Sequence, residues 1–490
     1  MLMRSAFSVF TSFVQLYTGL FILNVILSCV IIFMERRKPT STLLWVMAIN
    51  FLPIIGFVFY LFLGQDLSKH KMFDRKGQVD KEIKTFLQEQ LDEMKKGTYE
   101  FENEKTKDYV EMIEMFHSSE NAAFSQNNDI KIYNEGVEKF KDLFKDIDEA
   151  KNSIYIQYYI LKSDGLGIEL LEKLKKKAQE GVEVLLLVDG MGARNFSLKY
   201  RRDVEKAGVK LAIFFPGLLP RINTRINYRN HRKLAIIDHK IGYVGGLNVG
   251  DEYISKSKKF GFWRDTHFRI LGPAVNGLQW RFFLDYRFAA KNANGGFVTP
   301  FDFNKKEGNK DICVVSSGPD TKAHAIRNGY SKMITRARKR VYIQTPYFVP
   351  DDGLLNDLKI AAMSGCEVSI MIPQKRDHPF VHWASMSFIG ELLKWGVKAY
   401  LYQDGFLHSK VVISDDYLSS VGTANFDIRS FELNFEVNAF VFDTEINKEL
   451  VEAFEIDVKK SKKITLEDYN NRNAIFKIKE SISRLLSPLL

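Results

Sequence analysis

Two stretches of this chain share one pattern, and together they decide the fold. The first is "HRKLAIIDHKIGYVGGLN", residues 231–248, and the second is "HSKVVISDDYLSSVGTAN", residues 408–425. In both, a lysine follows the histidine by two positions and an aspartate follows it by seven. A glycine comes seven residues after the aspartate, and an asparagine three residues after the glycine. Chance agreement at five spaced positions is very improbable, so the pattern indicates an internal duplication.

The sequence around each motif is duplicated as well. "NSIYIQYYIL" (152–161) corresponds to "KRVYIQTPYFV" (339–349), and "GVEVLLLVDG" (181–190) corresponds to "GCEVSIMIPQ" (365–374). Short apolar runs separated by helical segments predict buried strands that alternate with helices. We therefore expect an α/β fold in which each half has a mixed, largely parallel sheet with helices on both faces.

The repeated histidines and lysines suit chemistry at a phosphodiester. On a strand, His231 and Lys233 point to the same face, as do His408 and Lys410. If the halves pair about a pseudo-two-fold axis, the four side chains converge on one anion-sized pocket. One neutral histidine can then attack phosphorus, and the other, protonated, can give its proton to the leaving alkoxide. The pattern predicts a double displacement through a phosphohistidine, with the lysines stabilising charge and without a metal or other cofactor.

Asparagines and glycines of the motif are predicted to assist substrate binding. Asn248 and Asn425 carry amide donors suited to the non-bridging oxygens of the phosphate. Gly246 and Gly422 permit close approach of the backbone near the phosphate, although a plain turn explains them equally well.

The acidic residues considered for the site fall into two groups. The motif aspartates, Asp238 and Asp415, lie an odd number of residues from their histidines. We expect them to face away from the phosphate and to serve structure. A catalytic histidine also needs a carboxylate that fixes its tautomer. Candidates are Glu436 in "ELNFEVNAF", 28 residues after His408, and Asp265 in "FWRDTHFRI", 34 residues after His231.

The N-terminus predicts a membrane anchor. No charged residue lies between Arg4 and Glu35, and none lies between Lys38 and Asp66. Each run exceeds the roughly 20 apolar residues that cross a bilayer. A helical hairpin explains two such runs better than a cleaved signal peptide does. Such a hairpin would place the protein in the cell membrane. Basic residues that follow the second run favour a cytoplasmic location for the rest of the chain.

Bulk composition limits the partners. The formal net charge is +10 and the isoelectric point is about 9.1, which favours nucleic acid, phosphorylated substrates or an acidic membrane. The three cysteines lack the spacing of a zinc site, which argues against a metal centre or a disulfide framework. The apolar hairpin favours the membrane among the anionic partners.

The doubled H-x-K-x-x-x-x-D pattern with its downstream G-[GT]-x-N resembles the phospholipase D superfamily. The stretches "ERRKPTSTLLW", "IQTPYFVP" and "GFLHSK" are similar to bacterial cardiolipin synthases. The resemblance covers about residues 125–445. It implies two tandem phospholipase D-like α/β/α domains that transfer a phosphatidyl group between two phosphatidylglycerol molecules, giving cardiolipin and glycerol. It also implies that Glu436 and Asp265 contact the catalytic histidines, and it favours His231 as the nucleophile.

Three further activities could use the same residues, and a catalytically inactive membrane scaffold is a fourth alternative. A hydrolytic phospholipase D or a phosphatidylserine synthase differs only in the acceptor that reaches the intermediate. A membrane-bound nuclease is disfavoured by the hairpin, and an inactive scaffold is disfavoured by two intact motifs.

We expect four segments along the chain. Residues 1–65 are predicted to form two transmembrane helices, and residues 66–125 a charged helical connector. Residues 126–300 and 301–490 are predicted to form the first and second phospholipase D-like domains, the latter with a C-terminal tail. The sequence predicts anionic membrane lipids as partners, no nucleic acid, and no particular oligomeric state.

Overall fold

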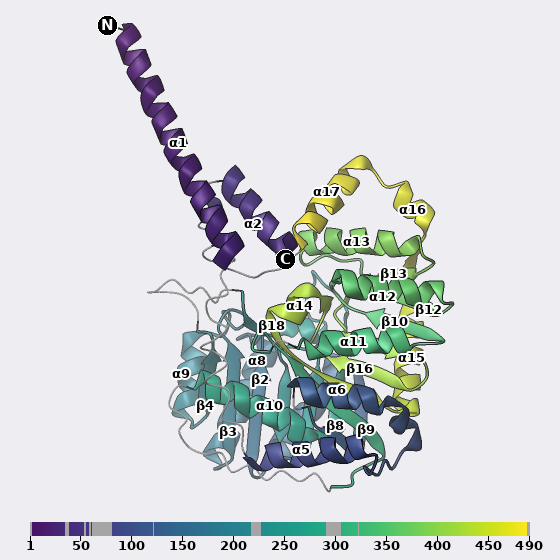
Figure 1. Cartoon of the computed structure of the whole chain (residues 1–490). Helices are drawn as coiled ribbons and strands as arrows, with labels where there is room; N and C mark the ends of the chain where they lie inside the picture. The colour runs from purple at the N-terminus through teal and green to yellow at the C-terminus, as the bar shows by residue number, and fades with distance from the viewer. Residues whose placement is uncertain are drawn as a thin grey trace. The chain divides into compact units, whose positions relative to one another are not determined.

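The computed structural model describes residues 2–34, 39–52, 55–57, 60, 81–120, 122–216, 227–290, 305–321 and 323–487 (Figure 1). The chain divides into two compact units. One comprises residues 1–71 and 218–227, and the other comprises residues 72–217 and 228–490.

The first unit contains helices α1 (Leu2–Met34) and α2 (Pro39–Phe51). A small apolar cluster, with Ile31 and Ile49 at its centre, joins the two helices. Trp45 packs edge-on against Tyr60, with ring centroids 5.5 Å apart. Within the described residues no helix combines the length and apolarity required of a membrane span. Part of the second predicted span, including residues 61–65, lies outside the described residues.

The second unit contains two mixed sheets that share one strand. In the first sheet β2, β3 and β4 run parallel. Strands β6, β7, β8 and β1 continue the sheet beyond β2, each antiparallel to the strand before it. The strands in spatial order are β4 (Lys210–Phe214), β3 (Glu183–Asp189), β2 (Ser153–Tyr158), β6 (Leu234–Ile237), β7 (Ile241–Gly245), β8 (Trp263–Leu271) and β1 (Phe124–Glu135).

The second sheet repeats this order. Strands β10, β12 and β13 run parallel, β15, β16, β18 and β9 follow antiparallel, and β19 adds an antiparallel edge. The strands are β19 (Ser461–Ile464), β13 (Lys398–Tyr402), β12 (Glu367–Pro373), β10 (Arg340–Gln344), β15 (Val411–Ser414), β16 (Leu418–Gly422), β18 (Asn434–Phe442) and β9 (Lys310–Ser317). Strand β1 pairs with both β8 and β9 and so joins the sheets.

The expectation of largely parallel sheets is wrong, although the mixed character is correct. Only three strands of each half are parallel, because only these are separated by crossover helices. After its third parallel strand, each half continues as a meander of adjacent antiparallel strands. These meanders carry the two motifs.

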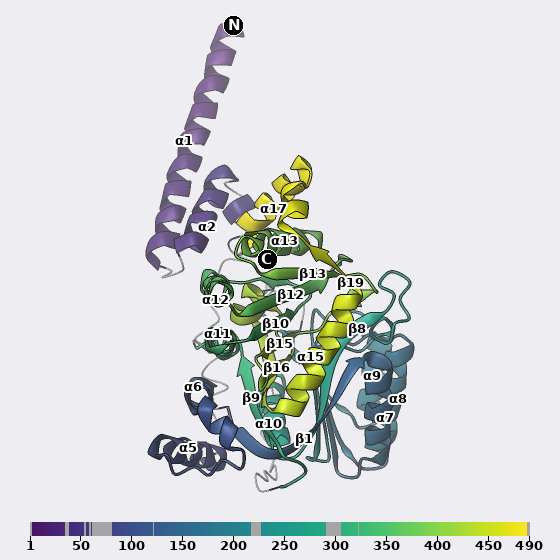
Figure 2. The same cartoon turned by 90° about the vertical axis from the view of Figure 1, so that its right-hand side faces the viewer.

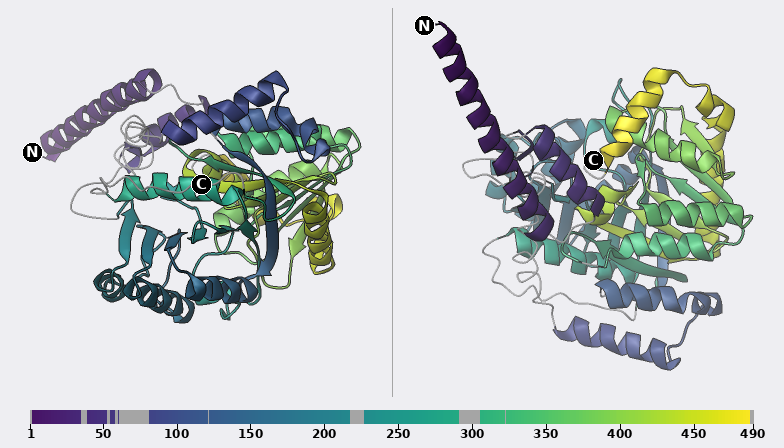
Figure 3. Two further views of the ribbon diagram at one scale, coloured as in Figure 1. Left: turned by 90° about the horizontal axis from the view of Figure 1, so that it is seen from below. Right: turned by 45° about the horizontal axis from the view of Figure 1, so that its top comes forward.

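Helices fill the space between and outside the sheets (Figure 2). The outer face of the first sheet packs against α7 (Gly136–Glu149), α8 (Gly165–Gln179) and α9 (Leu198–Lys206). The outer face of the second packs against α11 (Ala325–Arg336), α12 (Asp352–Met363) and α13 (Pro379–Leu393). Helices α10 (Ala274–Ala289) and α15 (Thr444–Lys459) share the core between the sheets. Figure 3 shows these layers from below.

The predicted connector contributes to the body of the protein. It forms α5 (Lys81–Lys96), the 3₁₀ helix η2 (Glu104–Tyr109) and α6 (Val110–Glu120). Met112, Ile113 and Phe116 of α6 are at most 1% exposed and belong to the apolar core of the second half. Part of the segment therefore packs with the second domain.

Candidate functional site

Two short strand pairings bring the motifs together across the two halves. Strand β5 (Arg229–Asn230) runs directly into His231 and pairs in parallel with the start of β18. Strand β14 (Phe406–Leu407) runs into His408 and pairs in parallel with the start of β8. The register is extended by the histidine amides, since His231 N donates to Phe435 O at 3.0 Å and His408 N to Arg264 O at 2.7 Å. Each histidine is therefore fixed by the opposite half.

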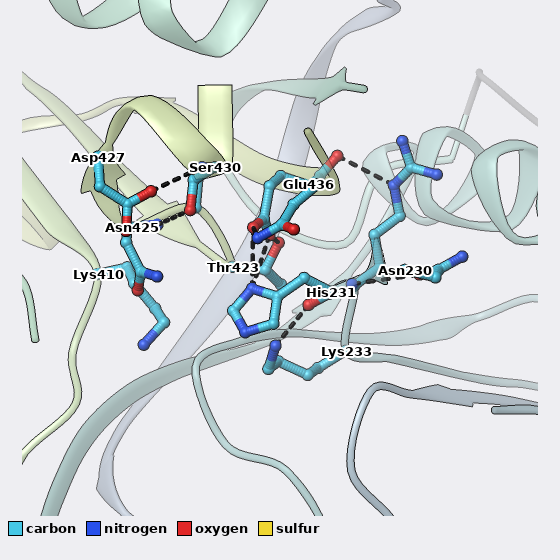
Figure 4. Close-up of polar contacts among 12 residues, drawn as sticks. Asn230, His231, Lys233, Lys410, Thr423, Asn425, Asp427, Ser430 and Glu436 are labelled. Atoms are coloured by element: carbon cyan, nitrogen blue, oxygen red, sulfur yellow. Dashed lines mark hydrogen bonds and ion pairs between the residues drawn. The ribbon is translucent and has the colours of Figure 1, made fainter. Parts of the chain in front are cut away.

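The same pairings give each histidine a carboxylate from the opposite half. His231 Nδ1 lies 2.9 Å from Glu436 Oε1, and His408 Nδ1 lies 2.8 Å from Asp265 Oδ2 (Figure 4 shows the first pair). Both carboxylates are fully buried. With Nδ1–H donating to the carboxylate, Nε2 of each ring is left to exchange a proton or attack an electrophile.

The histidines and lysines do not lie on strands, contrary to the sequence expectation. Residues 231–233 and 408–410 form short irregular segments between the strands β5 and β6 and the strands β14 and β15. Both ammonium groups donate to the carbonyl oxygen of the preceding motif histidine, Lys410 Nζ at 2.6 Å from His408 O and Lys233 Nζ in the same way to His231 O. This shared contact holds each lysine beside its histidine.

Burial sets the charge state of the free site. It lowers the pKa of His231 and of His408 to about 4, although the carboxylates act in the opposite direction. It also lowers the pKa of Lys233 to about 7 and that of Lys410 to about 8. Burial acts to raise the pKa of Glu436, but contacts with His231 and Lys233 outweigh it and keep that pKa below its usual value. The free site thus holds neutral imidazoles and lysines that titrate near neutrality.

Anion binding is expected to take up protons. A bound anion favours the charged form of Lys233 and Lys410, whose pKa values in the free site are about 7 and 8. Affinity for sulfate, which does not titrate here, will fall as the pH rises above about 7, and more steeply above about 8, by up to about tenfold per pH unit for each proton. Calorimetry in buffers of different ionisation enthalpy measures this uptake. A pH-independent affinity would contradict it, and Lys233→Met should reduce the uptake.

The motif aspartates bind backbone amides. Asp238 accepts hydrogen bonds from the amides of residues 151–153, at 2.7–2.9 Å, where the chain enters β2. Asp415 accepts from the amides of residues 338–340, at 2.7–3.1 Å, where it enters β10. Both aspartates lie at a tight turn with φ of 51°. These contacts are those of residues that hold the start of a strand.

Asp415→Ala tests this role. Three amides would lose their acceptor, and alanine disfavours the left-handed backbone at this position, so the free energy of unfolding should fall by about 3 kcal/mol. Activity per folded molecule should stay within a few fold. Asp416→Ala is the matched control, because this neighbouring carboxylate pairs with the surface side chains of Lys339 and Arg340. Denaturant unfolding and activity at a temperature well below the transition separate the two effects.

The motif glycines make room for buried side chains. A Cβ at Gly246 would lie 2.0 Å from Asp265 Oδ1, and one at Gly422 would lie 2.3 Å from Asn438 Oδ1. The close approach at these positions is therefore between the backbone and neighbouring side chains. At Gly246 that side chain is the partner of His408.

The motif asparagines differ in their surroundings. Asn248 accepts from the amide of Ile160 at 3.1 Å and donates to the hydroxyl of Tyr253 at 3.3 Å. Asn425 is 4% exposed, and its side-chain oxygen has no hydrogen-bond partner within the described chain. Figure 4 shows it beside Lys410. Of the two, Asn425 is the better placed to meet a ligand.

Sequence reasoning missed the buried ion pairs next to the motifs. Arg232 Nη1 lies 2.5 Å from Asp285 Oδ2, and Arg264 Nε lies 2.8 Å from Asp457 Oδ2. Both aspartates also accept from a strand glutamine, Gln157 in the first half and Gln344 in the second, each at 2.8 Å. The signal for this network was the duplicated "IQ" in "YIQYY" and "YIQTP", a polar residue repeated within two apolar strands.

Aromatic rings line the two histidines. The Tyr159 ring lies 5.0 Å from that of His231, and the Trp263 ring lies 5.3 Å from that of His408. Trp263 also donates from Nε1 to Asp265 Oδ2 at 3.3 Å. These rings limit the motion of the imidazoles and exclude water from one side of each.

Family comparisons match both halves and the N-terminus. A family described as cardiolipin synthase, phospholipase D-like domain, matches residues 143–261 and 330–458. The phospholipase D-nuclease N-terminal family matches residues 22–65.

Similar proteins span nearly the whole chain. It is 45% identical to the major cardiolipin synthase of Bacillus subtilis, over 96% of this chain and 98% of the relative. It is 46% identical to cardiolipin synthase 2 of Staphylococcus epidermidis, over 97% and 98%. Among solved structures, the phosphatidylserine synthase of Haemophilus influenzae superposes with a TM-score of 0.58 at 16% identity, covering 77% of this chain and 97% of that one. This last likeness shows the fold alone.

Proposed function

Since the chain belongs to the cardiolipin synthases with paired phospholipase D-like domains, we propose that it joins two phosphatidylglycerol molecules through a phosphohistidine. The observation that carries the mechanism is the pair of crossed histidine–carboxylate contacts, His231 with Glu436 and His408 with Asp265. Two equivalent, largely buried and oriented imidazoles suit a reaction that needs a nucleophile and an acid.

The first step forms the covalent intermediate. Nε2 of neutral His231 attacks the phosphorus of one phosphatidylglycerol, and the bond from phosphorus to the glycerol oxygen breaks. His408, protonated when the anionic substrate binds, donates the proton from Nε2 to the leaving glycerol. Asp265 stabilises the imidazolium before this transfer, and Glu436 stabilises the positive charge that develops on His231.

The second step reverses the roles of the groups. His408 is now neutral and takes the proton from a hydroxyl of a second phosphatidylglycerol. That oxygen attacks phosphorus, the bond to His231 Nε2 breaks, and cardiolipin leaves with His408 protonated again. The first step exchanges a P–O bond for the P–N bond to His231, and the second exchanges that P–N bond for a new P–O bond. The overall reaction therefore replaces one phosphodiester with another, is reversible and consumes no nucleotide.

Charge on the phosphate is stabilised by the lysines. Lys233 and Lys410 are fully buried and lie beside the two histidines, so their ammonium groups act on the reacting phosphate in surroundings of low dielectric constant. Asn425 is proposed to donate to a non-bridging oxygen, with Asn248 in the corresponding place in the first half. The proposed mechanism assigns Asp238, Asp415, Gly246 and Gly422 to the architecture that supports these groups.

The N-terminal region is proposed to anchor the enzyme in the cell membrane. The uncharged runs between Arg4 and Glu35 and between Lys38 and Asp66 support two spans, and the basic residues beyond them support cytoplasmic catalytic domains. The protein should therefore stay in the membrane fraction after alkaline carbonate washing. Protease added outside intact protoplasts should spare the catalytic domains. Release by carbonate, or cleavage from outside, would contradict this topology.

A vesicle assay tests the function. Purified enzyme in phosphatidylglycerol vesicles should form one cardiolipin for each glycerol released, without nucleotide or added divalent cation, and excess glycerol should reverse the reaction. Formation of phosphatidic acid alone would replace the synthase with a hydrolytic phospholipase D. Formation of phosphatidylserine when serine is supplied would indicate a phosphatidylserine synthase, and cleavage of single-stranded DNA would indicate a nuclease.

A further inference from the structure

The C-terminal helix α17 (Ala474–Leu485) exposes its apolar side chains and buries polar ones. The exposed apolar side chains recur every three or four residues and so form a stripe along one face of the helix. Glu480 and Ser483, on the inner face, are at most 4% exposed. A helix packed on a protein in water normally has the reverse arrangement. The stripe comprises Ile475 (58% exposed), Ile478 (59%), Ile482 (50%) and Leu485 (61%).

Exposed apolar residues concentrate on this helix. Beyond residue 60, thirteen large apolar side chains are exposed within the described chain, and five of them lie on these twelve residues. Large apolar patches on a protein surface mark contact with another molecule or a membrane. The density on α17 therefore requires an occupant.

Ion pairs fix the helix in this orientation. Arg472 donates to Glu480 from Nε at 2.9 Å and from Nη2 at 2.6 Å, and the Tyr469 hydroxyl donates to the same carboxylate at 3.2 Å. Arg484 pairs with Glu391 of α13, and its guanidinium lies 4.5 Å from the ring centroid of Phe388. Figures 1 and 2 show α17 beside α13. The outward stripe is thus held by specific polar contacts on its inner face.

The apolar surface continues toward the catalytic groups. Lys479 extends over the ring of Trp383, 4.9 Å from its centroid, and Phe380 in the first turn of α13 is half exposed. Two residues before α13, the Asp377 carboxylate accepts from the Tyr347 hydroxyl and is close enough to Lys410 to act on its pKa. The start of α13 therefore connects the exposed apolar surface with the catalytic site.

The charges around the stripe favour an anionic surface. Lys477 and Lys479 lie on α17, where Arg484 is already paired with Glu391 of α13. The one acidic residue of the helix, Glu480, is buried and paired with Arg472. Exposed Lys462 and Lys463 lie on the nearby edge strand β19. Aliphatic side chains flanked by cations are the composition of helices that lie in the interface of an acidic bilayer.

We propose that α17 and the first turn of α13 dock on an anionic lipid bilayer, with the four aliphatic side chains of the stripe among the acyl chains. This contact holds the catalytic site at the interface, where the lipid headgroups are, independently of the N-terminal anchor. The choice of a bilayer as occupant rests on the lipid substrate of the proposed function. The N-terminal hairpin and a second copy of the chain are the competing occupants.

Site-specific fluorescence tests the contact in the full-length enzyme. Cys29→Ser removes the exposed native thiol, and the two others are buried. In this background Ile478→Cys carries an environment-sensitive NBD label, and Ile456→Cys on α15, with a similar exposure of 53%, is the matched control. In phosphatidylglycerol vesicles the emission of the label at 478 should shift to the blue and be quenched severalfold by doxyl lipids. The label at 456 should remain in a polar environment and unquenched.

Two results would overturn the docking proposal. One is a label at 478 that remains in a polar environment in the vesicles. The other is a label that is shielded without lipid quenching and crosslinks to the hairpin or to a second copy. Neither result depends on catalysis. The docking proposal can therefore fail while the synthase function stands, and the synthase function can fail while the docking proposal stands.

Activity measurements give a second readout. The activity of the double variant Ile478→Asp, Ile482→Asp on long-chain phosphatidylglycerol in vesicles should be about tenfold lower than that of the unaltered enzyme. On short-chain phosphatidylglycerol dissolved below its micellar concentration it should stay within twofold of the unaltered enzyme, as should Ile456→Asp on both substrates. Equal loss on both substrates would indicate damage to the fold and overturn the proposal, as would unchanged vesicle activity.

Discussion

His231→Ala will lower cardiolipin formation by about 10⁴-fold or more, and His408→Ala by about 10³-fold. The first variant lacks the proposed nucleophile, and the second lacks the proposed acid, whose contribution in enzymes of this kind is about 10²–10⁴-fold. The His408 side chain is buried, that of His231 is only 12% exposed, and each is held by a carboxylate of the opposite half, so water cannot easily replace them. Thin-layer quantification of cardiolipin measures the loss.

A substrate with a good leaving group separates the two roles. Phosphatidyl-p-nitrophenol expels its alcohol without protonation, so His408→Ala should release a burst of nitrophenol equal to the enzyme concentration. His231→Ala should give no burst. The reverse pattern would make His408 the nucleophile, and near-normal turnover in either variant would refute the two-histidine mechanism. His239→Asn is the control, since this histidine follows Asp238 in the first motif and binds Gln279 and Ser153.

Glu436→Gln will lower activity by about 10²–10³-fold with little change in KM. The carboxylate contacts His231 Nδ1 through both oxygens, at 2.9 and 3.1 Å, and raises the pKa of that ring against the effect of burial. A neutral amide removes this support and no longer fixes the tautomer. We expect the acidic limb of the pH–rate profile to move to lower pH, because His231 then protonates less readily. Steady-state rates on short-chain phosphatidylglycerol across pH measure both effects.

Conservative and control variants distinguish positioning from damage to the fold. Glu436→Asp keeps the charge and should recover part of the activity. Glu120→Gln neutralises another buried carboxylate, one that burial leaves with a pKa of about 7 and that pairs with Arg281, and it should retain activity. Equal losses in Glu436→Gln and Glu120→Gln would mean that buried charge supports folding at both positions. That result would remove the special role of Glu436.

Spacing within the sequence was sufficient to find the duplication. The five matched positions of each motif predicted two similar halves, and the family comparison matches both. Spacing also predicted that Asp238 and Asp415 differ from the histidines in role, because an odd separation directs side chains apart. The hydrogen bonds of both aspartates to strand-entry amides are those expected of such a role. The duplication is confirmed because it depends on spacing alone, whereas the role of the two aspartates stays a prediction.

The sheet pattern was predicted less well for a related reason. Apolar runs show that a strand is buried, but they do not show the direction of its neighbour. The parallel strands of each half were recognisable from their crossover helices, whereas the antiparallel meanders that follow were not. The histidines and lysines were consequently placed on strands instead of in the short segments between them.

The composite site was decided by tertiary structure alone. From the sequence, Glu436 follows His408 and Asp265 follows His231, yet each carboxylate contacts the histidine of the other half. The exchange arises because β5 pairs with β18 and β14 with β8 across the interface. Tertiary structure also decided that the apolar face of α17 points outward, because periodicity identifies an amphipathic helix but not which of its faces the protein covers. Sequence thus determined the residues and their local geometry, while docking of two separately patterned halves determined which of them meet.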